Sequence, residues 1–242
     1  ASDVYKRQTH FKGHEQAGFG GCLKNIGMGC GSRAGKMEQH NSGKPFVKQK
    51  KCVGCHACSV ACKEAHGTRP GVRRSRVERT FEGTYPSARK TAVPMLCMHC
   101  ETAPCVEVCP QDATYKRDDG IVVIDKDKCI GCGACQTACP YDARHLAASE
   151  DGYFGSELNE YEAVMYTAMP PATMDKCTFC AERIDAGLGE KQACVAACPA
   201  GARVFGELDD IRAEAEAAGG YQLLPEEDTN PSVWYIPFNV NK

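Results

Sequence analysis

The chain has 242 residues, which is long enough for one large domain or two small ones with a buried core. Its 29 basic and 31 acidic residues nearly balance, so we expect no nucleic-acid partner and no anionic membrane surface held by bulk charge. No apolar run approaches the roughly eighteen residues of a membrane-spanning helix, and we expect any membrane role to come through another protein.

The first 45 residues differ in character from the rest. Residues 1–8 match the translated end of a transposon used in sequencing-library preparation, and we set them aside as a processing scar. Residues 9–45 are rich in glycine and poor in apolar side chains, a composition that predicts a loosely packed segment. Cys22 and Cys30 lie here; we expect free thiols, with a metal site as the less favoured interpretation.

The other sixteen of the eighteen cysteines form four groups. The first and third have C-x₂-C-x₂-C-x₃-C spacing, the second widens its middle gap to four residues, and the fourth widens it to thirteen. A proline directly follows the second, third and fourth groups. In chain order the groups are Cys52, Cys55, Cys58 and Cys62; Cys97, Cys100, Cys105 and Cys109; Cys129, Cys132, Cys135 and Cys139; and Cys177, Cys180, Cys194 and Cys198.

This spacing favours iron–sulfur chemistry over two alternatives. Disulfide scaffolds normally belong to short secreted chains and spread their cysteines among loops. Structural zinc sites usually pair C-x₂₋₄-C motifs across a longer gap and often recruit histidine. Three thiolates in a tight loop, with a fourth ahead of proline that binds the other cluster of a pair, are typical of [4Fe–4S] proteins. The sequence therefore predicts four [4Fe–4S] clusters, with Gly54, Gly131 and Gly133 supplying positive φ in the ligand loops.

The segments between the groups predict the fold. Between the second and third groups, Asp118-Asp119-Gly120 predicts a turn and Ile121–Ile124 a strand, which is the layout of a small bacterial ferredoxin. The first and fourth groups would then form a second module around it. We therefore predict an α+β domain over residues 46–206, with two nested bacterial-ferredoxin-like two-cluster modules and long loop insertions. Residues 63–96 and 140–176 are the insertions, too long for structureless loops, and we expect them to contact partners.

Residues 207–242 are predicted to form a C-terminal helix and an extended tail. Arg203–Gly206 resembles a closing strand, and Asp209 or Asp210 can cap a helix that begins near Ile211 and stops at Gly219. The apolar tail that follows can lie on this chain or on a partner, and the sequence leaves both alternatives open.

Polar residues near the cysteines predict no catalysis. We expect His56, His66, His99 and His145 to tune clusters through hydrogen bonds or to lie at the surface. We expect the basic stretch to be a solvated loop, with a docking surface for an acidic partner as the alternative; it comprises Arg73, Arg74, Arg76 and Arg79.

From about Lys51 to Phe238 the chain resembles a known family. The residues that carry the match include Cys52-Val53-Gly54-Cys55-His56-Ala57-Cys58, Pro94-Met95-Leu96-Cys97-Met98-His99-Cys100 and Cys177-Thr178-Phe179-Cys180-Ala181-Glu182-Arg183, and the wide fourth group is the most specific feature. They are similar to the iron–sulfur subunit of membrane-bound molybdopterin oxidoreductases of the dimethyl sulfoxide, polysulfide, thiosulfate and tetrathionate reductase type.

The resemblance implies a function and a set of ligands. It implies an electron-transfer subunit that is not an enzyme by itself, placed between a molybdopterin-containing catalytic subunit and an integral membrane quinone-binding anchor, and so peripheral to the membrane. It also implies nested ligand sets: Cys52, Cys55, Cys58 with Cys198; Cys177, Cys180, Cys194 with Cys62; Cys97, Cys100, Cys105 with Cys139; and Cys129, Cys132, Cys135 with Cys109. The alternatives are a free-standing polyferredoxin that carries electrons by diffusion and a zinc-dependent interaction module.

Residues 9–45 resemble a different, uncharacterised domain that commonly precedes a two-cluster ferredoxin. Our hypothesis is an assembly chimera with its seam between about Lys44 and Cys55; the opposing interpretation is a genuine fusion in which His10 and His14 build a second site. The chimera hypothesis predicts that deletion of residues 1–44 leaves cluster content and thermal stability unchanged.

Overall fold

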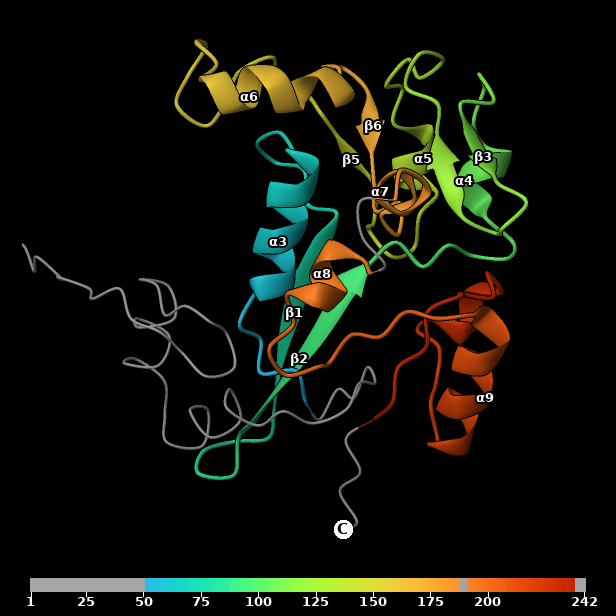
Figure 1. The fold of residues 1–242 in the computed structure, drawn as a ribbon. Coiled ribbons are helices and arrows are strands. Elements are labelled where there is room, and N and C mark those ends of the chain that lie inside the picture. Colours follow the sequence, from blue (N-terminus) through green and yellow to red (C-terminus); the bar gives the residue numbers. More distant parts are fainter. Residues whose placement is uncertain (1–50, 188–190, 238–242) are drawn as a thin grey trace, which may run out of the picture. The chain divides into compact units, whose positions relative to one another are not determined.

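The computed structural model describes residues 51–187 and 191–237. The chain divides into two units, Ala1–Gly43 and Lys44–Lys242, and every described residue belongs to the second. The expectations for residues 1–45, including Cys22 and Cys30, lie outside the described residues. The described part combines short helices with two-stranded antiparallel sheets (Figure 1).

Four helices carry cysteines of the ligand groups: α3 (Ala57–His66), α4 (Pro104–Glu107), α5 (Ala134–Thr137) and α8 (Ala193–Ala196). The last three have only four residues each, and a proline follows shortly after each, where the chain cannot continue as a helix. No proline follows Cys62, so α3 runs for ten residues. It ends at Gly67, whose left-handed backbone donates a hydrogen bond to the Lys63 carbonyl.

The predicted ferredoxin hairpin is confirmed. Strand β3 (Thr114–Lys116) pairs antiparallel with β4 (Val122–Ile124), with Thr114 opposite Ile124. Gly120 turns the chain with φ of 80°. The hairpin packs against α4, and Val122 is buried in the main apolar core with cysteines of the second and third groups. Local strand propensity and a glycine turn therefore suffice to predict this part of the fold.

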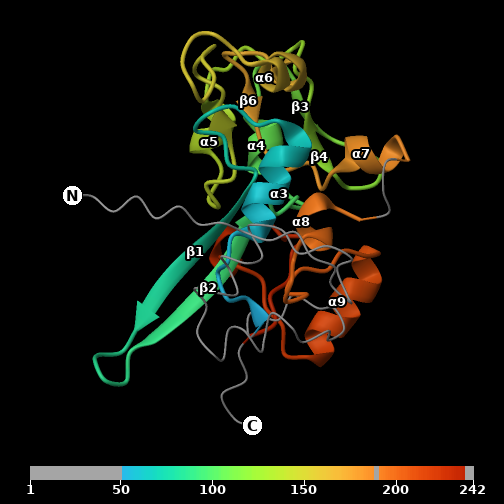
Figure 2. The same ribbon diagram turned by 60° about the vertical axis from the view of Figure 1, so that its left-hand side comes forward.

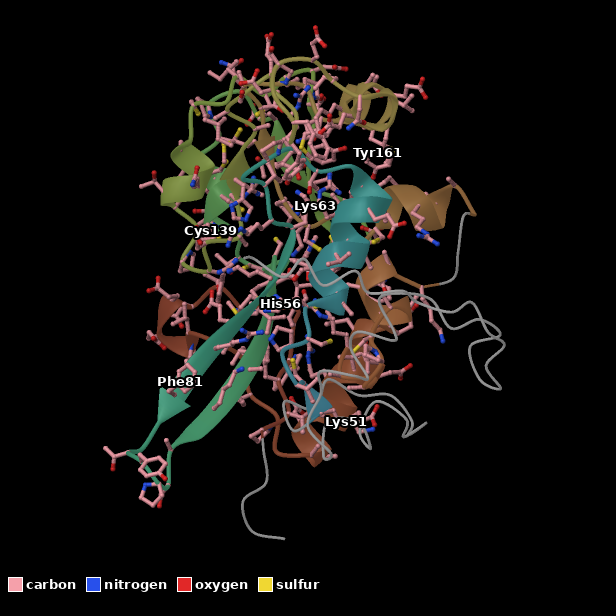
Figure 3. All side chains as sticks on the ribbon, turned by 90° about the vertical axis from the view of Figure 1, so that its left-hand side faces the viewer. Lys51, His56, Lys63, Phe81, Cys139 and Tyr161 are labelled. Carbon is pink, nitrogen blue, oxygen red and sulfur yellow. The ribbon has the colours of Figure 1, made fainter. Side chains whose placement is uncertain are left out.

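The first long insertion, residues 63–96, is mostly a β-hairpin. Strand β1 (Ser75–Glu82) pairs along its whole length with β2 (Arg89–Leu96), with Ser75 opposite Leu96. The hairpin extends away from the ligand helices, and Phe81 lies near its far end (Figures 2 and 3). Phe81 is 73% exposed and Tyr85, in the connecting turn, is 93% exposed. The base of the hairpin is buried, whereas its far half contacts solvent on both faces.

The second insertion, residues 140–176, also has its own secondary structure. Helix α6 (Glu160–Met165) begins with a capping box, in which Asn159 accepts a bond from the Glu162 amide and Glu162 from the Asn159 amide. A 3₁₀ turn follows over Tyr166–Ala168. Strand β5 (His145–Leu146) pairs with β6 (Met174–Asp175), so the two ends of the insertion meet directly before the fourth cysteine group.

The C-terminal region corrects two predictions. Residues 203–206 form no strand, because Arg203 is buried against the cysteines and the backbone there has no partner strand among the described residues. Helix α9 (Leu208–Ala217) exists as predicted, but Glu207 is its N-cap residue. Asp209 and Asp210 lie in its first turn, where their charge favours the helix dipole. The predicted caps are therefore wrong by one helical turn at most.

The tail lies on this chain. Tyr221 and Tyr235 form an antiparallel bridge, and Tyr235 is fully buried with its hydroxyl donating to the Pro94 carbonyl at 3.0 Å. A 3₁₀ turn over Pro225–Glu227 lies between them, and helix α7 (Ala181–Asp185) completes the described elements. Within residues 51–187 and 191–237, none of the helices is long and apolar enough to cross a membrane.

Candidate iron–sulfur sites

The structure brings the cysteines together across groups. One cavity is lined by Cys97, Cys100 and Cys105 of the second group together with Cys139 of the third. A second cavity is lined by Cys129, Cys132 and Cys135 of the third group together with Cys109 of the second. Each cavity thus combines three cysteines of one loop with the last cysteine of the other group.

The first and fourth groups meet in the same way. Cys62, Cys177, Cys180 and Cys194 line one larger cavity that continues toward α9 and the tail. Burial, and then the nearby Cys58 and Cys198, raise the pKa of the Cys52 thiol. Cys55 is exposed in the same loop. We number the four predicted sets for reference. Site I is Cys52, Cys55, Cys58 and Cys198; site II is Cys62, Cys177, Cys180 and Cys194; site III is Cys97, Cys100, Cys105 and Cys139; site IV is Cys109, Cys129, Cys132 and Cys135.

The thiols suit a strongly positive occupant. All sixteen described cysteines are free. Burial, followed by the nearby Cys194 and Cys97, raises the pKa of Cys177 to about 12, and burial with Cys97 and Cys105 raises that of Cys100 to about 11. Converging buried thiols therefore resist ionisation until a metal centre supplies positive charge and releases their protons. The chemistry of the donors fits iron–sulfur clusters.

Backbone amides point at several sulfurs. Amide nitrogens lie 3.1 Å from Cys198 Sγ at Ala202, 3.4 Å from Cys129 Sγ at Met174 and 3.4 Å from Cys177 Sγ at Phe179. At Cys109, burial would raise the thiol pKa, but the amides of Thr114, Gln111 and Ala113 outweigh it and lower that pKa. Such bonds favour the thiolate and tune the potential of a bound cluster.

The ligand loops use left-handed backbone, as predicted at the glycines. Gly54, Gly131 and Gly133 have φ of 69°, 64° and 76°. Gly131 is required by space as well, since a Cβ there would lie 2.0 Å from the Ala172 carbonyl oxygen. Equivalent loops place His56 at 62° and His99 at 44°, so the loop geometry recurs even where the residue is not glycine.

Two histidines lie inside the protein beside the sites. His99 is buried, stacks on Phe179 with centroids 3.7 Å apart, and its Nδ1 accepts the Val122 amide at 3.0 Å. Burial, with Lys176 and Arg144 nearby, holds the His99 pKa well below its usual range, so the ring is neutral. His66, at the end of α3, places Nε2 3.2 Å from Cys180 Sγ and Nδ1 2.9 Å from Glu182.

The other two histidines are more peripheral. His56 is the N-cap residue of α3, beside the hairpin (Figure 3), and burial together with Arg79 and Lys90 lowers its pKa. His145 lies in β5, half-buried, and burial lowers its pKa as well. In the described structure, therefore, only His66 and His99 among the four lie where they can act on a site directly.

The solvated-loop prediction for the basic stretch is wrong for three of its four arginines. Arg79 donates to the Gly54 carbonyl at 2.7 Å in the first ligand loop, and Arg76 to the Tyr141 carbonyl at 2.8 Å after the third group. Arg74 forms a buried pair with Asp175 at 2.7 Å and 3.0 Å, ahead of the fourth group. Each of these three contacts the chain beside a different cysteine group, although Arg79 is exposed, and Arg73 is exposed as predicted.

Sequence reasoning missed three buried cations that lie beside the cysteines. Arg144 and Lys176 are 1% exposed and Arg203 is 5% exposed. Lys176 Nζ donates to the carbonyls of Val122 and Cys177. A repeated motif could have revealed the two arginines, because each stands five residues after a cysteine in Cys-Pro-x-x-Ala-Arg: Cys139 to Arg144, and Cys198 to Arg203.

Comparison with known proteins decides the family. Two profiles of the 4Fe–4S dicluster domain match residues 89–152 and 121–199. A subunit of the sulfite dehydrogenase of Allochromatium vinosum is 43% identical over 211 residues, which are 77% of this chain and 79% of that protein. The chain belongs to the iron–sulfur electron-transfer subunits of dimethyl sulfoxide reductase-type molybdoenzymes.

Other relatives in this family agree. The iron–sulfur subunit of arsenate respiratory reductase of Shewanella sp. strain ANA-3 is 37% identical, covering 78% of this chain and 94% of its own length. The electron transfer subunit of thiosulfate reductase of Salmonella typhi is 38% identical, covering 67% and 74%. Members of the family are electron-transfer subunits of enzyme complexes and not the catalytic subunits. Two dicluster domains and sixteen grouped cysteines correspond to four [4Fe–4S] clusters.

Proposed function

We propose that this subunit relays electrons between a molybdopterin-containing catalytic subunit and an integral membrane quinone-reactive anchor, through one [4Fe–4S] cluster at each of sites I–IV. When bound, each cluster supplies a centre that gains and loses one electron, so that one site is oxidised as its neighbour is reduced. The cavities lined by site II, site III and site IV support the nested ligand sets. Association with the membrane would then come through the partners.

The observation that carries the proposal is the serial order of the sites. Burial raises the pKa of Cys194 in site II, and Cys58 of site I is close enough to add to that rise. In the same way, Cys97 of site III adds to the rise that burial causes in the pKa of Cys177 in site II. Cys105 of site III does the same for Cys135 in site IV. Cys97, Cys105, Cys135 and Cys177 also share one buried core, and α3 packs on α8. These neighbours support a single series, I–II–III–IV, as a relay requires.

Exposure supports partner docking at the two ends of this series. Site I and site IV each have one exposed cysteine, Cys55 and Cys132, whereas the cysteines of sites II and III are buried or half-buried. An exposed apolar side chain stands beside each end, Val53 at 39% and Ile130 at 60%. At the matching loop position of site III, Met98 is 1% exposed. Apolar residues at the mouths of the terminal sites suit protein interfaces.

The first test is composition. Anaerobically prepared protein should contain about 16 iron and about 16 sulfide per chain, four cubanes of about four each. Stoichiometric zinc without iron after anaerobic reconstitution would overturn the proposal in favour of the zinc module.

The second test addresses the two ends. The subunit would be co-expressed with the products of its neighbouring genes, and Val53→Glu and Ile130→Glu compared by size exclusion. We expect each substitution to release a different partner while iron content stays intact. Leu224→Glu in the C-terminal tail, outside both insertions, is the matched control, since Leu224 is 37% exposed; it should release neither. A wild-type subunit that elutes alone, fully loaded with iron, would instead indicate a free-standing polyferredoxin.

A further inference from the structure

Each module has one arginine enclosed between its two sites. We call sites III and IV the inner module and sites I and II the outer module. Arg144 in the inner module is 1% exposed and Arg203 in the outer module is 5% exposed. Both stand five residues after the last cysteine of a group, at the end of a Cys-Pro-x-x-Ala-Arg motif. Their equivalent positions in sequence lead to equivalent positions in space.

Arg144 bridges the inner module. Its Nη2 donates to Cys105 Sγ of site III at 2.9 Å, and its Nη1 donates to Thr114 Oγ1 at 3.1 Å. On the other side, burial raises the pKa of Cys135 in site IV, and the charge of Arg144 opposes that rise. Thr114 itself stands five residues after Cys109, where a third copy of the motif would place an arginine, and here it orients Arg144 instead.

Arg203 occupies the same place in the outer module. Its Nη1 lies 3.9 Å from Cys194 Sγ of site II, and its charge acts on Cys58 of site I. Its Nε and Nη2 are buried without a hydrogen-bond partner among the described residues. Cys105 and Cys135 around Arg144 are the third cysteines of their groups, and so are Cys194 and Cys58 around Arg203. The pseudosymmetry of the two modules thus extends to their central cations.

Within the described part of the chain, neither arginine has an acidic partner. The strongest charges that act on Arg144 are Cys105, Cys135 and Cys97, and those on Arg203 begin with Cys194 and Cys58. Arg74 is different, because the nearby Asp175 neutralises it. A guanidinium keeps its proton at any physiological pH, and its field is strong in a buried, weakly polarisable environment. The charge of Arg144 and of Arg203 is therefore directed at the sites themselves.

We propose that Arg144 and Arg203 are redox-tuning residues, each of which raises the reduction potentials of the two clusters that flank it and screens their mutual repulsion. The inference rests on the ligand sets of the proposed function. Each electron gained adds one negative charge to a site, and the fixed positive charge between two sites favours that gain at both. The arginine loses no proton and forms no bond in the process.

The test is an anaerobic redox titration followed by electron paramagnetic resonance on the four-cluster subunit. Arg144→Gln should lower both inner-module potentials, so that the ratio of reduced to oxidised cluster at a fixed ambient potential falls about tenfold, or about 59 mV for one electron. The outer-module potentials should stay unchanged. Arg203→Gln should give the converse pattern, and Arg212→Gln, on the exposed face of α9, should shift none.

Lysine variants separate charge from packing. Arg144→Lys and Arg203→Lys keep one positive charge in a different shape, and we expect potentials close to those of the unaltered protein. If a glutamine variant fails to hold its clusters, the lysine variant still tests the proposal. A tenfold fall in the ratio of reduced to oxidised cluster in the lysine variant would overturn it. Full iron content with unchanged potentials in the glutamine variants would also overturn it. Loss of the proposed function looks different, since it appears as missing iron in the unaltered subunit.

Discussion

The inner and outer modules build the same arrangement by different routes. In the inner module, the second and third cysteine groups are joined by the short hairpin β3–β4, which local sequence preferences form by themselves. In the outer module the two halves are far apart in the chain, as the contact between His66 and Cys180 across 114 residues shows. Closing such a long loop costs more conformational entropy, so the outer module depends on contacts that the inner module does not need.

Those contacts come from the insertions. Beside the direct packing of the ligand helices α3 and α8, Arg79 of β1 holds the first ligand loop, and the Arg74–Asp175 pair fixes the chain ahead of the fourth group. The insertions that separate the two halves of the outer module therefore also supply the groups that join them.

The helices that carry the ligands show the same difference. Proline after the cysteine group keeps α4, α5 and α8 to four residues, whereas Lys63 after Cys62 allows α3 to run on to His66. One consequence is that His66 reaches Cys180 of site II. In the inner module, Thr114 stands five residues after Cys109 and Arg144 five residues after Cys139. Neither position is a histidine.

The largest expected effect is the loss of a cluster. Cys198→Ser should remove or convert the cluster at site I, lowering iron by up to about four per chain, while sites III and IV keep their spectra. Cys139→Ser is the matched change in the inner module and should affect site III alone. Iron analysis and electron paramagnetic resonance check both. The nested assignment is wrong if Cys198→Ser disturbs only the cluster of Cys177, Cys180 and Cys194.

Next in size is the buried ion pair that joins the modules. Asp175 is paired with Arg74 and, at 2.9 Å, with Lys126, and its side chain is 2% exposed. Asp175→Asn leaves Lys126 without its carboxylate partner and leaves Arg74 with only the half-exposed Glu182 at 3.1 Å, and it should lower the free energy of unfolding by about 3–5 kcal/mol. Thermal unfolding under anaerobic conditions measures it. Asp209→Asn, where the exposed Asp209 lies 3.8 Å from Arg212 in the first turn of α9, should cost less than about 1 kcal/mol.

The same pair predicts how the stability difference between Asp175→Asn and the unaltered protein varies with pH. Burial raises the pKa of Asp175, but Arg74 and Lys126 outweigh it and hold that pKa below its usual 3.8. A carboxyl group whose pKa is lowered in the folded state stabilises the protein at every pH above its pKa in the unfolded state. This contribution disappears only as the pH falls through the pKa of the folded state. The difference between Asp175→Asn and the unaltered protein should therefore be constant from about pH 5 to pH 8. A difference that shrinks within this window would contradict the assignment.

The smallest effect tests the helix difference. Lys63→Pro gives the first group the Cys-Pro ending of the other three and should shorten α3, at a cost of about 3 kcal/mol. Lys63→Ala keeps the helix backbone and loses the contacts of Nζ, with the Thr68 carbonyl and hydroxyl at 2.9 and 3.0 Å, the Arg69 carbonyl at 3.5 Å and the Tyr153 ring; it should cost about 1 kcal/mol. Only the proline variant should also alter the site II spectrum, because it displaces His66. Equal spectra in both variants would show that His66 does not act on site II.

The sequence by itself determined the groups of cysteines, the cofactor class and the elements that arise locally. Hairpin β3–β4, helix α9 and the left-handed ligand loops follow from turn residues, strand propensity and spacing over a few residues. The sequence failed where the outcome depends on a distant surface. The strand predicted at Arg203–Gly206 has no partner among the described strands, and the tail had two open alternatives that only the burial of Tyr235 under the Pro94 carbonyl decided.

Only the tertiary structure decided what the basic residues do. Arg74 and Arg76 look like solvated charges in sequence, yet each finds a carboxylate or carbonyl from a segment more than sixty residues away. Arg144 and Arg203 end a repeated motif whose meaning is invisible until two cysteine sets close around each of them. A long, flexible cation is assigned to water or to the interior by the groups within its reach, and in this protein folding brings those groups from elsewhere in the chain.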